Sequence, residues 1–239
     1  MAKIIILNGP ANVGKDTIGN ALAKDYNCIT TSFKRPMFEI AASILGARAF
    51  SKFITAYDDR DQKELPHDFL GGKTCREFMI WISESVVKPL FGNQQFGKLM
   101  SEHIQMRDEG FCFVSTDGGF PDEVIRLVED GHYVTLVRLF MDGKTFDGDS
   151  RNYIQVKWSH FPDCEKYQEH DVNLVSGDID GGVLAVASAC GLVSDYECLD
   201  GLPWQIARIA KPAPVGFVIV SSHQARGRKN EAIPIKQSP

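Results

Sequence analysis

The 239-residue chain contains no run of the roughly 18 apolar residues that a membrane-spanning helix requires. Its opening stretch, MAKIIILNGP, has one positive charge and an apolar run too short for a signal peptide. Its six cysteines are scattered without a C-x-x-C pair, so the sequence indicates neither a disulfide framework nor a zinc site. We therefore expect a globular cytoplasmic protein without a membrane partner.

Negative charge dominates the chain but is unevenly distributed. The formal net charge is −5, whereas residues 201–239 hold six lysines and arginines against one glutamate, a charge of +5, which leaves −10 on residues 1–200. We therefore expect residues 1–200 to form the folded domain and residues 201–239 to be a C-terminal extension with a basic tail. Such a tail can attract a polyanion such as DNA, or it can simply be a solvated terminus.

Apolar periodicity predicts that strands and helices alternate along the chain. Residues 51–72 are charged and predict an irregular, mobile segment, and Pro89 is expected to end or kink a helix. The alternation favours an α/β fold of three layers, in which helices cover both faces of a central, mostly parallel sheet. The expected strands cover residues 3–7, 28–32, 110–117, 132–139, 170–174 and 215–220, and the expected helices cover residues 15–24, 36–46, 74–92, 96–107, 120–131 and 182–190.

The stretch NGPANVGKDT, residues 8–17, lies between the first expected strand and the first expected helix. Its spacing from Gly9 to Gly14 and Lys15 is that of a phosphate-binding loop, G-x-x-x-x-G-K. Successive N–H groups at a helix N-terminus attract phosphate oxygens, and a lysine at this position reaches the β- and γ-phosphates of ATP. We therefore predict an ATP site formed by Gly9, Ala11, Asn12, Val13, Gly14, Lys15, Asp16 and Thr17; the alternative is a glycine-rich turn with an incidental lysine.

Carboxylate and hydroxyl oxygens near this loop are candidate ligands for Mg²⁺, the ion that accompanies ATP in phosphoryl transfer. Asp16 stands where Ser or Thr is usual, so either Asp16 or the adjacent Thr17 is expected to meet the metal. Asp117 follows an apolar strand, and its expected role is to complete the metal shell or to orient the acceptor. The alternative for Asp117 is a helix N-cap.

Basic residues supply the remaining candidates. Arg138 is expected at a strand end and Arg151 in a long loop, where both can neutralise charge in the transition state. Lys34, Arg35 and Arg76 start helices, which suits binding of an acceptor phosphate. Each of these residues can equally be a solvated surface group.

Four segments resemble the phage-type deoxynucleoside monophosphate kinases, which are P-loop kinases of the adenylate and thymidylate kinase kind. These segments are GPANVGKDT, SFKRPMFEIAASILG, KTCREFMIWI and FVSTDGGFPDEVIRLVEDGHYVTLVRL, and the resemblance covers roughly residues 3–140, with a weaker match in HDVNLVSGD. Members of that family also carry aspartate after the P-loop lysine. The chain departs from the family at Gly119, where an arginine is usual two residues after the strand-ending aspartate.

The resemblance implies a nucleoside monophosphate kinase-like fold with an acceptor-side helical part near residues 33–108 and a lid-like excursion near residues 141–160. It further implies transfer of the γ-phosphate of ATP, with Mg²⁺, to a deoxynucleoside monophosphate, and a homodimer is possible. The missing arginine and the basic tail leave open a kinase resembling those that phosphorylate 5-hydroxymethyluracil in phage DNA. A nucleotide-binding module without a small acceptor is a third possibility.

Overall fold

The computed structural model describes residues 1–107, 110–147, 151–157 and 165–193. The strand expected at residues 215–220 and the basic tail lie outside this part of the chain. In the described residues, no helix combines the length and the apolar character needed to cross a membrane.

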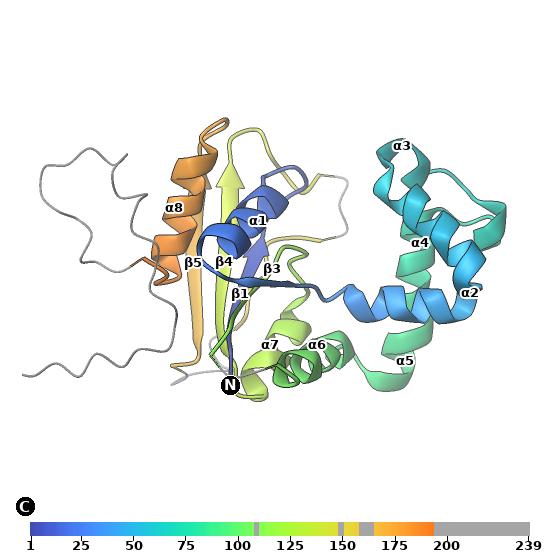
Figure 1. Cartoon of the computed structure of the whole chain (residues 1–239), viewed down its shortest axis with the longest axis horizontal. Helices are drawn as coiled ribbons and strands as arrows, with labels where there is room; N and C mark the ends of the chain where they lie inside the picture. Colours follow the sequence, from blue (N-terminus) through green and yellow to red (C-terminus); the bar gives the residue numbers. More distant parts are fainter. Residues whose placement is uncertain (108–109, 148–150, 158–164, 194–239) are drawn as a thin grey trace, which may run out of the picture.

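Five parallel strands form one sheet in the order β2-β3-β1-β4-β5, which confirms the expected α/β class (Figure 1). β1 lies at the centre because its four consecutive apolar residues from Ile4 to Leu7 are fully buried on both faces. The strands run over β1 Lys3–Asn8, β2 Ile29–Thr31, β3 Cys112–Ser115, β4 Tyr133–Met141 and β5 Tyr167–Leu174.

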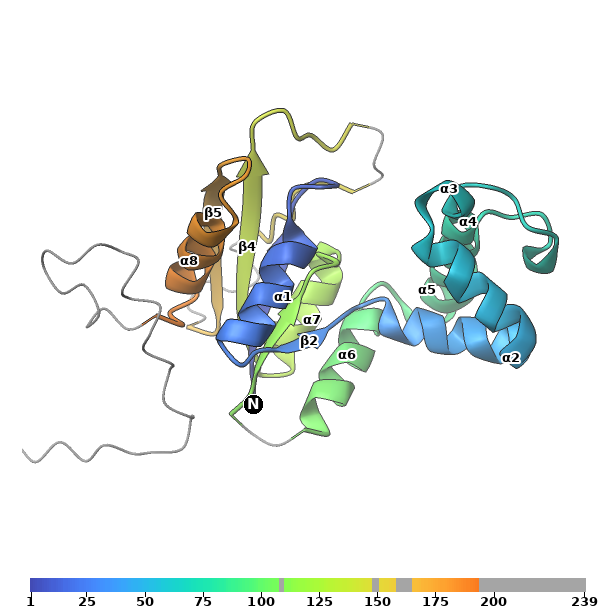
Figure 2. The ribbon, with the colours of Figure 1, turned by 45° about the horizontal axis from the view of Figure 1, so that its top comes forward.

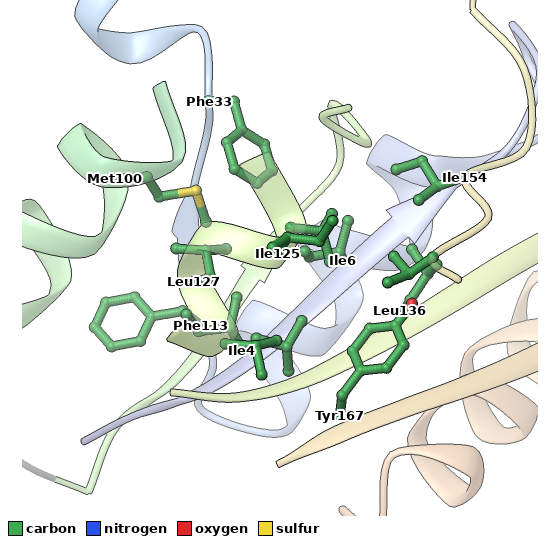
Figure 3. Close-up of a cluster of buried hydrophobic side chains, with 14 of the residues drawn as sticks. Ile4, Ile6, Phe33, Met100, Phe113, Ile125, Leu127, Leu136, Ile154 and Tyr167 are labelled. Atoms are coloured by element: carbon green, nitrogen blue, oxygen red, sulfur yellow. The ribbon is translucent and has the colours of Figure 1, made fainter. Parts of the chain in front are cut away.

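Helices cover both faces of the sheet, so the three-layer arrangement is also confirmed (Figures 1 and 2). α1 (Lys15–Asp25) and α8 (Ile179–Ala189) pack on one face, whereas α6 (Gln95–Gln105) and α7 (Pro121–Glu129) pack on the other. Figure 3 shows the second of these cores, in which Phe113 and Leu127 lie against Ile4 of the central strand. A strand, a glycine loop and a helix thus follow one another at the centre of the fold.

A separate helical part lies beyond the β2 edge of the sheet (Figure 1). It has its own core, in which Phe53 of α2 is fully buried and contacts Phe78 of α4 at 5.8 Å between ring centroids. Its elements are α2 Arg35–Asp58, α3 Arg60–Lys63, the 3₁₀ turn Asp68–Leu70, α4 Cys75–Ile80, the π-helix Trp81–Val87 and α5 Lys88–Phe91.

Two expectations for this helical part were wrong. Residues 51–72 are largely helical because apolar side chains among the charges, such as Phe53 and Ala56, are buried in its core. The end expected at Pro89 was wrong, because the helical path continues to Phe91; the residues before this last turn, Trp81–Val87, form a π-helix. The chain leaves the helix at Gly92, which has φ of 86°.

Candidate active site

The loop from Gly9 to Gly14 connects β1 to α1 at the carboxyl edge of the sheet. Gly14 is the N-cap of α1 with φ of 99°, a left-handed conformation that favours glycine. At Gly9 a Cβ atom would lie 2.9 Å from the carbonyl oxygen of Leu139, so the loop can pass β4 only without a side chain there. The two glycines of the motif are therefore required for different reasons: Gly14 for its backbone conformation, and Gly9 for the limited space beside β4.

Lys15 is folded back over this loop. Its Nζ donates hydrogen bonds to the carbonyl oxygens of Gly9 (2.7 Å) and Pro10 (2.6 Å). No side chain of the described residues caps the first turn of α1, so its N–H groups remain available to an anion. The lysine ammonium and these N–H groups together suit a phosphate chain lying along the loop.

Asp16 and Thr17 lie in the first turn of α1, and both are exposed. The hydroxyl of Thr116 donates a 2.6 Å hydrogen bond to Oδ1 of Asp16, which links α1 to the segment after β3. Gly19 permits this contact, because a Cβ at that position would overlap the Thr116 methyl group. The carboxylate of Asp16 is thus held on the side of the loop that faces Asp117.

Asp117 lies two residues beyond β3 and accepts three hydrogen bonds. They come from the hydroxyls of Ser32 (2.6 Å) and Ser115 (2.5 Å) and from the backbone N–H of Lys34 (3.0 Å). It is not a helix N-cap, because α7 begins after Phe120. Its carboxylate instead joins the carboxyl ends of β2 and β3 and is fixed in one orientation.

The oxygen atoms of Asp16, Thr17 and Asp117 fit the chemistry of Mg²⁺. Among the described residues, no group of three or more acidic, histidine or cysteine side chains is arranged to hold a metal. Magnesium in nucleotide sites is commonly held by one or two carboxylates together with phosphate oxygens and water. The donor set here therefore suits a metal that arrives with a nucleotide.

Basic side chains from the helical part gather around Tyr57 near the end of α2. The Nζ atom of Lys63 lies 3.7 Å from the centroid of the Tyr57 ring. Burial lowers the pKa of Lys63, and the positive charges of Lys34 and Arg76 lower it further. Arg76 forms a 3.0 Å ion pair with Glu64. Two residues chosen from sequence, Lys34 and Arg76, thus lie within electrostatic range of Lys63, which sequence analysis missed.

We call Lys34, Lys63 and Arg76 the cation cluster. Its link to the sheet is Lys34, whose N–H donates to Asp117. The pKa of Tyr57 responds to charges from both parts of the fold. Burial raises this pKa, and the charge of Asp117 raises it further, whereas the charges of Arg76 and Arg151 lower it. The Tyr57 hydroxyl therefore lies within electrostatic range of groups from the sheet and from the helical part. Neighbouring cations of this kind can attract an anion, although Glu64 already pairs with Arg76.

Arg151 belongs to a segment, residues 151–157, that is docked on the sheet. The hydroxyl of Tyr153 donates to the carbonyl oxygen of Leu139 (3.0 Å), and the N–H of Ile154 donates to Oδ1 of buried Asn8 (2.9 Å). Tyr153 also stacks on Phe140, with ring centroids 4.3 Å apart. The predicted lid-like excursion is therefore anchored at this end, beside the P-loop strand.

Arg138 does not end its strand, because β4 continues to Met141 with apolar residues that pack on both faces. Its guanidinium donates to Asp171 (2.6 Å) and to the carbonyl oxygen of Ile154 (3.2 Å), and it lies 3.1 Å from a carboxylate oxygen of Glu169. The side chain thus ties β5 and residues 151–157 to β4. In this structure it is an anchor of the loop that carries Arg151.

Arg35 is directed away from the cation cluster. Its Nε lies 3.0 Å from Glu39, and its guanidinium contacts the ring of His103 on α6. Arg35 and His103 line a hollow of about 250 Å³ beside β2. The structure therefore does not bring Arg35 together with Lys34 and Arg76, because the first turn of α2 presents Arg35 toward α6.

Gly119, the position at which the resembling family has arginine, is closely covered. It has φ of 58°, and a Cβ there would lie 2.7 Å from the buried ring of Phe33. Close by, Glu123 is 3% exposed, and burial raises its pKa to about 8. The space for an arginine side chain is thus filled by an aromatic ring and a largely buried carboxyl group.

A second hollow of about 70 Å³ lies between the P-loop and the start of α8. Thr17 of α1 and Gly177 and Ile179 before and within α8 contribute to its lining. Val175 and Ile179 are apolar yet 69% and 55% exposed, which leaves a flat apolar rim. A rim of this kind next to a phosphate loop suits one face of a nucleotide base.

No family model and no curated protein matches this sequence. Among solved structures, it is similar to a sugar kinase from Janibacter sp. HTCC2649 (10% identity, TM-score 0.38, 81% of this chain and 96% of that one). It is also similar to a gluconokinase from Sinorhizobium meliloti 1021 (10%, 0.36, 79% and 91%) and to an uncharacterized protein from Eubacterium ventriosum (12%, 0.39, 79% and 98%). Likenesses this distant indicate neither a family nor a substrate for this chain. The P-loop fold is instead evident from the chain's own strand order and glycine loop.

Proposed function

We propose that the protein is an ATP-dependent phosphotransferase whose acceptor is a deoxynucleoside monophosphate. The observation that supports this proposal is the presence of two groups of cations near Asp117, which accepts a hydrogen bond from the N–H of Lys34. One is the P-loop with Lys15, and the other is the cation cluster with Lys63 at its centre. A donor and an acceptor that both carry phosphate require two such features facing one space.

On the donor side, the loop from Gly9 to Gly14 holds the phosphates of ATP through its backbone N–H groups. The Lys15 ammonium exchanges its carbonyl partners, Gly9 and Pro10, for oxygens of the β- and γ-phosphates. The adenine lies over the apolar rim formed by Val175 and Ile179.

Magnesium, when bound with ATP, offsets the negative charge that develops on the transferring group. Asp16 and Thr17 provide its protein oxygens at the loop. Asp117 is held by Ser32, Ser115 and the Lys34 N–H, so it orients groups between the donor and the acceptor. Its fixed carboxylate also keeps the end of β2 in register with β3.

On the acceptor side, Lys34, Lys63 and Arg76 bind the dianionic phosphate of the monophosphate. An incoming phosphate relieves the mutual repulsion of these cations, which are close enough to lower the pKa of Lys63. Arg151 approaches from the sheet side, where residues 151–157 are anchored. The acceptor phosphate thereby lies between the helical part and the P-loop.

The filled space at Gly119 supports a second candidate function. Without an arginine at that position, one contact to an acceptor phosphate is missing, as expected if the acceptor is a hydroxymethyl group on a base in DNA. Such an acceptor needs no monophosphate site. The cation cluster favours the monophosphate, and the acidic body of the protein is a poor surface for a polyanion.

Steady-state kinetics of Arg76→Gln tests the proposal. The KM for the monophosphate should rise about tenfold or more, because the substitution removes one charged contact to a phosphate, whereas the KM for ATP should change little. Arg48→Gln, which removes an exposed arginine from α2, is the matched control. An equal change in both KM values, or none in either, would contradict the acceptor assignment.

A further inference from the structure

Arg60, the first residue of α3, makes a direct contact between the helical part and the P-loop. Its Nη2 donates a 3.2 Å hydrogen bond to Oδ1 of Asn12. Asn12 lies between the two motif glycines and has φ of 59°, a left-handed conformation. Sequence analysis placed Arg60 in an irregular segment and gave it no role.

The path of the chain explains how Arg60 reaches the loop. α2 leaves β2 and then bends at Gly46, whose φ of 69° and ψ of 165° are not helical. Figure 1 shows the second half of α2 turning upward from the first, so that α3 lies at the level of the P-loop. A glycine allows this bend, because φ of 69° is unfavourable for other residues. The bend therefore determines the position of α3.

α3 is short, and its surroundings hold it in place. Oδ1 of Asp59 caps it by accepting hydrogen bonds from the N–H groups of Asp61 (2.9 Å) and Gln62 (3.2 Å). At its other end, the ammonium of Lys63 lies over the Tyr57 ring, which packs against Phe53. Arg60 and Lys63 thus project from one anchored turn, Arg60 to the P-loop and Lys63 into the cation cluster.

The guanidinium of Arg60 forms no close ion pair within the described residues. In that part of the chain no carboxylate lies within 4.0 Å of it, and the atom that accepts its hydrogen bond, the side-chain oxygen of Asn12, is neutral. Two carboxylates flank it in sequence, Asp59, which caps α3, and Asp61 in the first turn of the helix, and neither forms an ion pair with it. An exposed guanidinium beside a phosphate loop is well placed to bind an anion that enters the loop.

We propose that Arg60 is a catalytic residue that binds the transferring γ-phosphate, as an arginine supplied within the same chain. When nucleotide is bound, the guanidinium exchanges Asn12 for phosphate oxygens and stabilises the charge that spreads over them during transfer. Because α3 also carries Lys63, acceptor binding at the cation cluster fixes Arg60 over the donor. This inference rests on the proposed function, in which ATP is the phosphoryl donor.

Turnover at saturating ATP and acceptor tests this role in Arg60→Gln, Arg60→Lys and the control Arg48→Gln. We expect Arg60→Gln to lower kcat about 100-fold or more, with Kd for ATP changed less than about fivefold, because the contact strengthens in the transition state. Arg60→Lys keeps the charge but not the planar fork and should recover part of the loss. Added guanidinium ion should increase the turnover of Arg60→Ala but not that of the wild type.

Two outcomes would overturn the role of Arg60. One is a kcat for Arg60→Gln within about threefold of the wild type while Lys15→Met is inactive, which would leave the proposed function intact. The other is a loss confined to Kd for ATP, which would make Arg60 a binding residue only. Failure of the proposed function looks different, since the wild-type protein would then transfer no phosphate to any deoxynucleoside monophosphate. Thermal unfolding of each variant distinguishes loss of contact from loss of fold.

Discussion

The hydroxyl of Thr116 donates a 2.6 Å hydrogen bond to the carboxylate of Asp16, 100 residues earlier in the chain. The contact places the aspartate that replaces the usual P-loop serine or threonine beside the segment carrying Asp117. It depends on Gly19, where any side chain would displace Thr116. Asp16 and Gly19 of α1 and the distant Thr116 thus build the candidate metal-binding side of the P-loop.

Asp16→Ala should therefore weaken the binding of the magnesium that turnover requires. We expect the Mg²⁺ concentration for half-maximal turnover to rise about tenfold or more, because a carboxylate oxygen is lost from the metal shell. Thr116→Val keeps the carboxylate but removes the hydrogen bond that orients it, so its shift should be smaller and in the same direction. A magnesium titration of turnover measures both. An unchanged titration in Asp16→Ala would transfer the role to Thr17.

Any side chain at Gly119, including the arginine of the resembling family, should destabilise the fold. Gly119→Ala combines a left-handed backbone with a contact of 2.7 Å to Phe33, and the overlap should lower the free energy of unfolding by about 1–3 kcal/mol. Gly143→Ala is the matched control, since Gly143 has φ of 72° and no atom within 4 Å of a Cβ. Urea unfolding of the two variants isolates the overlap. Equal losses would show that Phe33 moves aside freely.

Glu123 should make the protein less stable as pH rises. Burial raises its pKa in the folded state to about 8, whereas the unfolded chain has a pKa of about 4.3. Between these values the folded state holds a proton that the unfolded state has released, so stability falls by about 1.4 kcal/mol per pH unit. Glu123→Gln removes this contribution and keeps an acceptor for the Phe120 N–H.

Urea unfolding at pH 5, 6.5 and 8 measures the effect. The variant should gain stability relative to the wild type as pH increases through this range. Glu102→Gln removes an exposed carboxylate of α6 and should show no such trend. Parallel pH dependences of the wild type and Glu123→Gln would mean that Glu123 is ionised in the folded protein.

Arg138→Gln separates an anchoring role from the catalytic role that sequence analysis predicted. The change leaves Glu169 and Asp171 without their cation and should lower the free energy of unfolding by about 3 kcal/mol. Residues 151–157 should also become more accessible to hydrogen exchange, because the bond to the Ile154 carbonyl is lost. Unchanged stability and exchange together with abolished turnover would instead support the catalytic assignment.

The sheet and the P-loop could be predicted because their signals are local. Ile4 to Leu7 is a buried apolar run, and the spacing of Gly9, Gly14 and Lys15 depends on a few consecutive residues. The position of Asp117 followed from the rule that parallel strands present ligand groups at their carboxyl ends. In each case one stretch of sequence contains the whole pattern.

The acceptor side could be predicted only in part, because its geometry depends on distant contacts. The sequence DDRDQK reads as a solvated loop, yet Asp59 caps a helix there and directs Arg60 and Lys63 to different partners. Arg35 and Lys34 are neighbours in sequence, but packing of α2 near α6 sends Arg35 toward His103. The direction of a side chain at a helix start follows from tertiary packing rather than from local sequence.

Transfer of label from γ-labelled ATP, measured in parallel with each of the four deoxynucleoside monophosphates and with DNA containing 5-hydroxymethyluracil, tests the central claim most directly. We predict labelled deoxynucleoside diphosphate from at least one monophosphate, little label in the polymer, and a loss of about 100-fold or more in Lys15→Met, about 3 kcal/mol on the barrier. Label that enters the DNA and no monophosphate, or a Lys15→Met variant as active as the wild type, would contradict the account.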